Sequence, residues 1–348
     1  MGGEPLVAAQ WSACQLSSVA MPEDLTAMQP AKGAGYLARF NAVVDYIDNH
    51  LAETLDLRTL AAVAHLSPWH FHRLFQAMMG ETLAEHVRRR RLEVAAGLLL
   101  SSPPVPVQAI ALDCGFGAAE VFTRTFKSHF GVTPSGWRMG GHESWVSARR
   151  VQLRKIHGTF RSRHQADECR ADDEGLVRPI GSGSTGQSSE ARVEVRTIPT
   201  MRVAYMRQVG PYGDPRIGRL WDQFVRWAAH NSLCDGKRAF FGVSHDSADI
   251  AMPDKCRYDT CVQVDAGFTP HRAVGAQEIR GGLYGCTRFA GSSDDIYEAW
   301  LGLYAHWLPD SGYQPDDRPC IEAYGTDVVV DPATGIFTCD LCLPIRPM

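Results

Sequence analysis

Two arginines, Arg73 and Arg124, lie at matching positions of a motif that occurs twice in the chain. Both copies read Phe-x-Arg-x-Phe and are followed by Gly-x-Thr. On a helix the two phenylalanines of each copy share one side, and the arginine points away from that side. A guanidinium presented in this way can donate two hydrogen bonds to O6 and N7 of a guanine. The motif therefore predicts two helices that read DNA.

The side chains beside each arginine are predicted to contact DNA with it. Trp69 can touch a thymine methyl group or a sugar, and Glu120 can accept a hydrogen bond from cytosine N4. Four consecutive arginines, 88–91, surround a helix, so only part of that run can face one partner. The alternative is that all these positions are solvated helix faces. The predicted DNA-binding residues are Trp69, His72, Arg73, Arg90, Glu120, Val121 and Arg124.

A carboxylate and many aromatic rings characterise the second half of the chain. Glu322 and Tyr324 lie two residues apart in a predicted strand, so they share one face of it. Eight of the ten tyrosines and four of the eight tryptophans follow residue 190. A carboxylate among rings suits an organic cation, because cation–π contacts add about 0.5–2 kcal/mol to the charge attraction. The alternative is that the rings form the core and Glu322 is a solvated strand residue.

Signals for metal and covalent chemistry are weak. Cys339 and Cys342 have the CxxC spacing, but residues three apart in a predicted strand point to opposite faces. One such pair is also only half of a zinc site. The ten cysteines are scattered over a long chain, which does not indicate a disulfide framework. We therefore expect no metal, no cofactor and no catalytic residue.

The net charge of −4 combines a basic and an acidic half. Residues 36–165 contain 16 Lys and Arg against 10 Asp and Glu, whereas residues 190–348 contain 16 against 21. The basic half predicts a polyanionic partner, and the acidic half a different one. Without an apolar run of about 18 residues or a signal-peptide pattern, we expect a cytoplasmic protein with no membrane partner.

The elements that carry these residues form two modules. In the first, Ser67 and Pro68 start one helix, and the capping box of Thr82 and Glu85 starts the next. A short apolar helix precedes each Phe-x-Arg-x-Phe helix, as in a helix-turn-helix. We predict an irregular arm over 1–34, an all-α tandem helix-turn-helix domain over 35–140, a basic and then Gly/Ser-rich linker over 141–190, and an α+β domain over 191–348.

The α+β domain is predicted to be a duplication. The order strand, helix, strand, strand occurs twice, and the helical stripe that begins with Trp221 and Phe224 recurs in Trp300 and Leu303. Two βαββ units would form one sheet with two helices. The cleft between such halves is a usual place for a small-molecule pocket.

The first module resembles the DNA-binding domain of AraC/XylS transcription regulators. The resemblance covers about residues 36–140 and rests on the segment Pro68-Trp-His-Phe-His-Arg-Leu-Phe, on Gly115-Phe ahead of the second motif, and on Phe130-Gly-Val-Thr-Pro-Ser-Gly-Trp-Arg. Trp137 stands where the family usually has tyrosine. The resemblance implies seven helices, of which the third and sixth enter successive major grooves about 34 Å apart. It also implies RNA polymerase as a further partner.

The second module is similar to the GyrI-like effector-binding domain, a duplicated SHS2 fold that follows AraC-type modules in Rob-like regulators. Glu322, in Ile-Glu-Ala-Tyr, corresponds to the acidic residue that such domains place in the ligand pocket. The resemblance implies a pocket around Glu322 with rings drawn from Tyr205, Trp221, Tyr258, Tyr284, Trp300, Tyr304, Trp307 and Tyr324.

These observations predict a sequence-specific transcription regulator. It would bind double-stranded DNA through its first module and a small hydrophobic, cationic effector, a drug or metabolite, through its second. Two alternatives remain. Some GyrI-like domains resemble hydrolases of electrophilic drugs, and Glu322 with Tyr258 or Tyr324 could then act as acid and base. The other alternative is a regulator whose second domain binds only protein.

Overall fold

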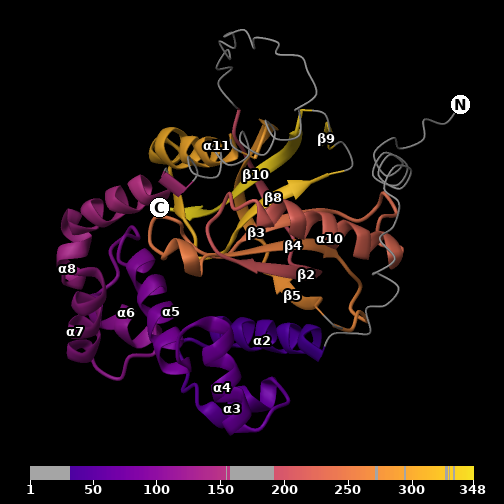
Figure 1. Cartoon of the computed structure of the whole chain (residues 1–348). Helices are drawn as coiled ribbons and strands as arrows, with labels where there is room; N and C mark the ends of the chain where they lie inside the picture. Colours follow the sequence, from indigo (N-terminus) through magenta and orange to yellow (C-terminus); the bar gives the residue numbers. More distant parts are fainter. Residues whose placement is uncertain are drawn as a thin grey trace, which may run out of the picture.

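Helices make up the first half of the described chain, and a sheet with two covering helices makes up the second (Figure 1). We call them the helical domain and the sheet domain. The predicted arm up to residue 31 and most of the predicted linker lie outside the described residues. The computed structural model describes residues 32–153, 155–156, 192–270, 273–293, 295–325, 328, 330–331 and 334–348, with side chains from residue 35.

The helical domain contains the two predicted helix-turn-helix units, α3–α4 and α6–α7. The second helix of each unit ends at a glycine with left-handed backbone, Gly80 (φ 66°) or Gly131 (φ 81°), a conformation that glycine adopts without strain. Thr82 and Thr133 then cap the next helices. The sequence repeat is thus a repeat of local structure. The helices are α2 (Lys32–Asn49), α3 (Leu57–Val63), α4 (Pro68–Met79), α5 (Leu83–Leu98), α6 (Val107–Asp113), α7 (Ala119–Phe130) and α8 (Pro134–Gly136).

Helix α5 joins the two units as a shared spacer. Leu83 and Val87, near its start, pack in the core of the first unit with Phe71. Leu92, further along the helix, packs in the core of the second unit with Phe122. Because one continuous helix belongs to both cores, the two units are held in a defined relative position.

The sheet domain confirms the predicted duplication. Its strand order is β1-β6-β10-β8-β3-β4-β2-β5, with β7 and β9 paired to β10. One unit is β2-α10-β3-β4 and the other is β6-α11-β8-β10, and the two meet where β3 pairs with β8. The elements are β1 (Glu194–Ile198), β2 (Met201–Val209), α10 (Arg216–His230), β3 (Phe240–Ser244), β4 (Arg257–Gln263), β5 (Gly275–Ile279), β6 (Gly282–Gly291), α11 (Ile296–Gly302), β7 (Tyr313–Pro315), β8 (Cys320–Tyr324), β9 (Val330–Asp331) and β10 (Ile336–Pro347).

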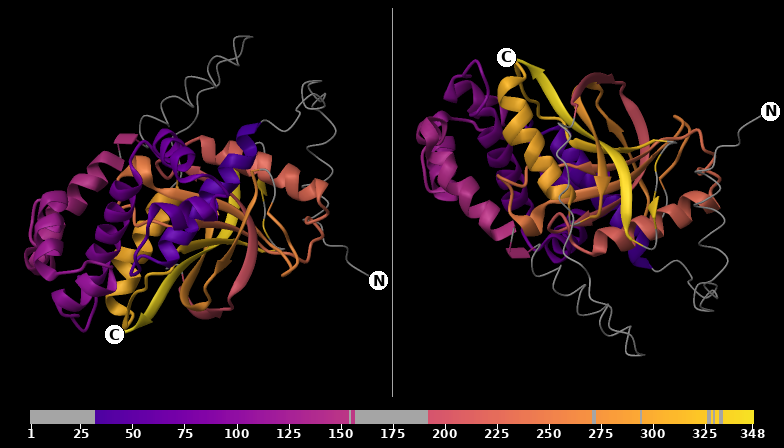
Figure 2. Two further views of the ribbon diagram at one scale, coloured as in Figure 1. Left: turned by 90° about the horizontal axis from the view of Figure 1, so that it is seen from below. Right: turned by 90° about the horizontal axis from the view of Figure 1, so that it is seen from above.

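The two faces of the sheet have different neighbours. Along β4, Tyr258 points toward α10, where Trp221 donates a hydrogen bond to its hydroxyl (3.2 Å). The next residue, Asp259, points to the opposite face and pairs with Arg207, which also pairs with Asp45 of α2. The view from below shows α2 lying across the strands of the sheet (Figure 2). The alternation of side chains along a strand therefore decides which residues meet the helical domain.

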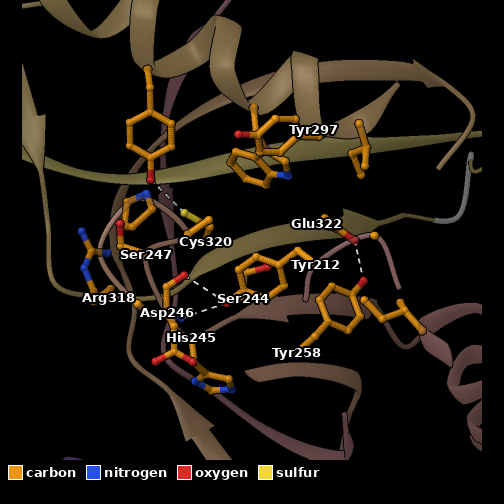
Figure 3. Close-up of a pocket in the computed structure, with 18 of the residues that line it drawn as sticks. Tyr212, Ser244, His245, Asp246, Ser247, Tyr258, Tyr297, Arg318, Cys320 and Glu322 are labelled. Atoms are coloured by element: carbon orange, nitrogen blue, oxygen red, sulfur yellow. Dashed lines mark hydrogen bonds between the residues drawn. The ribbon is translucent and has the colours of Figure 1, made fainter. Parts of the chain in front are cut away.

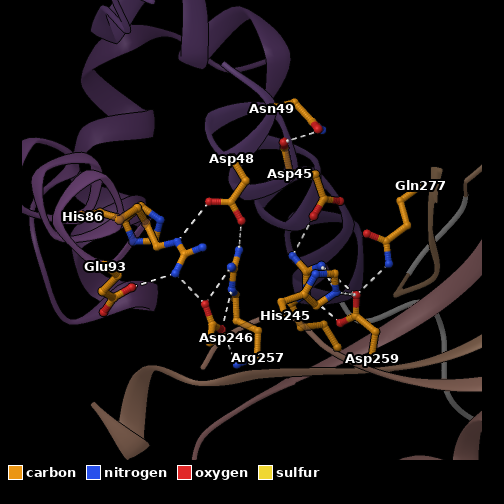
Figure 4. Close-up of polar contacts among 12 residues, drawn as sticks. Asp45, Asp48, Asn49, His86, Glu93, His245, Asp246, Arg257, Asp259 and Gln277 are labelled. Atoms are coloured by element: carbon orange, nitrogen blue, oxygen red, sulfur yellow. Dashed lines mark hydrogen bonds and ion pairs between the residues drawn. The ribbon is translucent and has the colours of Figure 1, made fainter. Parts of the chain in front are cut away.

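Buried arginines hold the two domains together (Figure 4). Arg90 of α5 contacts Asp48 (3.0 Å), Glu93 (2.6 Å) and Asp246 of the sheet domain (2.5 Å). Arg257 of β4 pairs with the same Asp48 and Asp246. The prediction that Arg90 contacts DNA is wrong for this arrangement, because its side chain is only 7% exposed and its charge is already neutralised by carboxylates.

A second ionic cluster lies beside the first. Asp259 accepts hydrogen bonds from Arg207 (2.7 Å) and Gln277 (2.8 Å) and lies 2.6 Å from the His245 ring. Burial opposes ionisation of Asp259, but Arg207 and His245 outweigh it and hold the pKa of Asp259 below its usual value. Asp45 completes the cluster from α2. The domains are thus also joined by the contacts of Arg207 with Asp45 on one side and Asp259 on the other.

The first part of the predicted linker is a helix that packs against the sheet domain. Residues 142–153 are helical. Trp145 donates a hydrogen bond to the Ile250 carbonyl (3.2 Å), and Arg150 pairs with Asp249 (2.9 Å). The basic residues of this stretch therefore contact the sheet domain. None of the helices in the described ranges is long and apolar enough to cross a membrane.

Arg90→Ala is expected to lower the free energy of unfolding of the full chain by about 3–5 kcal/mol. The change leaves the buried Glu93 and Asp246 and the partly buried Asp48 without one of their cationic partners. Denaturant unfolding followed by circular dichroism measures this loss. Arg88→Ala removes an exposed arginine from the same run and should change stability by less than about 0.5 kcal/mol. Equal effects of the two changes would contradict the structural role of Arg90.

Candidate functional site

A cavity of about 1340 Å³ lies on the face of the sheet that α10 and α11 cover (Figure 3). Six of the predicted pocket residues line it. They come from two helices and two central strands, so the junction of the duplicated units forms its inner end. The six are Trp221 of α10, Tyr258 of β4, Trp300 of α11, Tyr304 after α11, and Glu322 and Tyr324 of β8.

Glu322 is the polar centre of this inner end. Its side chain is 7% exposed and accepts hydrogen bonds from the hydroxyls of Tyr258 (2.6 Å) and Tyr324 (3.0 Å) at Oε2. Trp300 donates a further hydrogen bond to the carboxylate. We call Glu322 with Tyr258, Tyr324, Trp221 and Trp300 the Glu322 site.

Burial raises the pKa of Glu322 above its ordinary value, although the hydrogen bonds from Tyr258, Tyr324 and Trp300 partly oppose this. No charged side chain contributes to the shift, and Glu322 forms no ion pair with any residue in the described ranges. A buried carboxylate that is stabilised only by neutral donors is costly to ionise. An incoming cation would remove much of that cost.

Aromatic rings form the walls around the carboxylate. The ring of Trp221 meets that of Tyr324 edge to face, with centroids 4.9 Å apart. Burial, together with the neighbouring Glu322, raises the pKa of Tyr258 well above its ordinary value, so its hydroxyl stays protonated and donates. The carboxylate is thus the acceptor in a set of neutral donors, with the partly exposed rings of Trp221, Trp300 and Tyr324 nearby, an arrangement that suits an organic cation.

Gly242 makes room for the Glu322 site, and sequence reasoning missed it. It lies on β3 directly opposite Glu322 in the register. A methyl group at this position would overlap the Tyr258 hydroxyl and come within 2.5 Å of Glu322 Oε2. The sequence does place a glycine inside the strand-like run 240–244, and such glycines often mark a close approach of other groups. This pattern could have indicated the role of Gly242.

Three predicted pocket residues lie elsewhere. Tyr205 points to the opposite face of the sheet and donates a hydrogen bond to Asp45. Tyr284 is buried in the core on that face. Trp307 packs against Tyr313, away from the cavity, because the helix widens after residue 302 and shifts the phase of its side chains. Strand alternation and this widened turn explain the wrong predictions.

The two predicted DNA-reading helices present their expected residues to solvent. On α4, Trp69, His72 and Arg73 are exposed, and the Arg73 guanidinium lies 4.8 Å from the centre of the Trp69 ring. On α7, Glu120, Val121 and Arg124 are exposed, while the two phenylalanines of the motif are fully buried. The sheet domain leaves these positions uncovered.

Two family models match the chain. A helix-turn-helix domain model matches residues 60–140, and a model of the GyrI-like small molecule binding domain matches residues 191–346. The first match spans α3 to α8, and the second contains all described elements of the sheet domain up to residue 346.

Relatives match parts of the chain. Regulatory protein SoxS of Salmonella typhimurium strain LT2 is 33% identical over 96 residues, which are 28% of this chain and 89% of that protein. The DNA gyrase inhibitor of Cronobacter sakazakii is 28% identical over 155 residues, 44% of this chain and 95% of that protein. A solved AraC-type transcriptional regulator from Chromobacterium violaceum is 26% identical with a TM-score of 0.29, covering 31% of this chain and 96% of its own.

Gly242→Ala is expected to destabilise the protein by about 1–3 kcal/mol, because the added methyl group overlaps the Tyr258 hydroxyl. Removing that hydroxyl with Tyr258→Phe should relieve part of the overlap. The double variant should therefore be more stable than the sum of the two single changes predicts, as measured by denaturant unfolding. Gly218→Ala, on a helix and facing open space, is the matched control and should be neutral or stabilising. If the stability change of the double variant equals the sum of the two single changes, the overlap between the added methyl group and the Tyr258 hydroxyl is contradicted.

Proposed function

Because the chain belongs to the AraC family of DNA-binding transcription regulators and carries a C-terminal GyrI-like small-molecule-binding domain, we propose that it senses an organic cation and recognises a specific DNA sequence. The observation that carries the first part is the buried carboxylate of Glu322, which has only neutral hydrogen-bond donors around it. The second part is supported by two exposed helices with equivalent arginines, Arg73 and Arg124.

The proposed effector is a hydrophobic cation. Its charge would lie beside Glu322, and its apolar body would contact the rings of Trp221, Trp300 and Tyr304. The Coulomb attraction is strong here because water is largely excluded from the carboxylate. The cation–π contribution favours the same ligand class. A neutral ligand would leave the cost of the buried charge in place, and an anion would increase it.

The proposed DNA contacts use the first two turns of α4 and α7. Arg73 packs over the Trp69 ring, which limits the conformations of its side chain before DNA is bound. A pre-positioned guanidinium loses less entropy when it bonds a base. In α7 the surface beside Arg124 presents Glu120 and Val121, which are suited to a cytosine amino group and a thymine methyl group. We therefore propose that α4 discriminates between DNA sequences more strongly than α7 does.

Arg73→Ala is expected to weaken binding to the preferred DNA sequence by about 1–3 kcal/mol and to relax the preference at one base pair. Fluorescence anisotropy with a set of single-base variants of a selected site measures both effects. Arg73→Lys keeps the positive charge but removes the bidentate donor, so it should lose the base preference with a smaller loss of affinity. An equal loss on every sequence would show that Arg73 contacts only phosphate.

Glu322→Gln is expected to weaken binding of tetraphenylphosphonium by at least about tenfold at neutral pH, as measured by calorimetry with the full chain. The amide keeps the shape of the side chain but removes the charge. In the wild type the affinity should fall as the pH falls through the raised pKa of Glu322, by about tenfold per pH unit below it. The variant should lack this pH dependence.

Thermal stability without ligand provides a control, because Glu322→Gln should raise it although the same change lowers the affinity for the cation. A carboxyl with a raised pKa stabilises the fold at low pH, and this contribution is lost as the pH rises through that pKa. Glu322→Gln should therefore melt at a higher temperature than the wild type at neutral pH, with a smaller difference at acidic pH. Equal binding of neutral triphenylphosphine oxide and the cation would contradict the proposal. Turnover of an electrophilic compound that Glu322→Gln abolishes would assign hydrolysis instead.

A further inference from the structure

The cavity extends beyond the sheet domain and reaches helix α5 of the helical domain. Its lining includes Val94, Gly97, Leu98 and Ser101. Val94, Gly97 and Leu98 are spaced i, i+3 and i+4, so they form one face of the helix, and Ser101 follows its end. Leu92, Ala95 and Ala96 lie on another face of α5 and pack in the core of the second helix-turn-helix unit. One face of α5 is therefore left to line the cavity.

Gly97 shows that there is open space at this wall. It is exposed, and a methyl group built on it would have no other atom within 4 Å. Val94 and Leu98, on either side of the same face, are only partly buried. From helix 142–153, Val146 lines the cavity as well. The far end of the cavity thus presents apolar side chains of the helical domain, beside the ion-paired Arg90, Glu93 and Arg150.

The connection between β3 and β4, residues 245–256, closes the cavity between the domains. Asp246 and Asp249 line the cavity and also pair with Arg90 and Arg150 of the helical domain. Ile250 lines it too, and its carbonyl accepts the hydrogen bond from Trp145. The same short segment therefore contacts the interior of the cavity and the helical domain.

The two ends of the cavity differ in charge. At the inner end, Glu322 is a buried carboxylate without an ion-pair partner in the described part of the chain. At the α5 end, the charges of Arg90 and Arg150 are already neutralised by aspartates. The volume of about 1340 Å³ exceeds the usual 300–1,000 Å³ of a small-molecule site. A ligand that matches both ends is long, with a cationic head and an apolar tail.

We infer that the helical domain is part of the effector site: a cationic amphiphile binds with its head at Glu322 and its tail against Val94, Gly97 and Leu98 of α5. This inference rests on the proposed function and specifies the class of effector. A ligand that contacts both domains binds most tightly when they are docked as described here. By linkage, any DNA complex that changes the docking must change the affinity for the ligand, and the ligand must change the affinity for DNA by the same factor.

The test compares two cations with the same head, ethyltriphenylphosphonium and octyltriphenylphosphonium, by calorimetry with the full chain. The wild type should bind the octyl compound at least about tenfold more tightly. Gly97→Phe fills the α5 end of the cavity, so it should remove this advantage while the ethyl compound binds as before. Unchanged binding of the ethyl compound also shows that the variant is folded. Gly97→Ala, a smaller change at the same position, should keep most of the advantage.

Gly302→Phe is the matched control. Gly302 is also helical and faces open space, but it does not line the cavity. This variant should keep the preference for the octyl compound. If Gly97→Phe keeps the preference as well, the inference is wrong while the Glu322 site stands. If the wild type binds neither cation, or if Glu322→Gln binds both as well as the wild type does, the proposed function fails and the inference fails with it.

Discussion

Arg90 has to be neutralised away from water, and this requirement determines how the two domains meet. Three carboxylates surround its guanidinium, two from the helical domain and one, Asp246, from the sheet domain. Removing the arginine would leave its three carboxylates with fewer cationic partners in a largely buried place, which is far more costly than a lost surface ion pair. Arg257 meets two of the same carboxylates from the opposite side. The arrangement of the domains, and with it the wall that α5 contributes to the cavity, depends on this cluster.

The carboxylate of the Glu322 site differs from those at the domain interface because it has no cationic partner in the described part of the chain. At the domain interface every buried carboxylate named above has a cationic partner, whereas Glu322 has only hydroxyl and indole donors. Folding thus leaves one charge that a ligand can compensate. If the effector is the proposed cation, its binding offsets the cost of keeping that charge buried and stabilises the sheet domain.

The β3–β4 connection relates these two electrostatic environments. It carries Asp246, which belongs to the interface cluster, and its neighbouring residues line the cavity. Lys255, near its end, donates a hydrogen bond to the carbonyl of Met79, the last residue of α4 (2.8 Å). The connection therefore contacts both the cavity and the end of α4, the first predicted DNA-reading helix. A ligand would influence DNA binding through these contacts only if its affinity differed between domain arrangements.

The sequence by itself determined the features that arise from neighbouring residues. The repeated caps, the glycine stops and the buried phenylalanines of both helix-turn-helix units depend on interactions within a few residues, so their spacing predicted them. The duplicated sheet and the shared face of Glu322 and Tyr324 followed from periodicity for the same reason. Tertiary structure decided which of four consecutive arginines are buried: Arg89 and Arg90 are, and one of the carboxylates that neutralise Arg90 lies 156 residues away. It also decided which tyrosines enter the cavity, since a shift of one residue in a strand reverses the face. The role of Gly242 became visible only when β3, β4 and β8 were placed side by side.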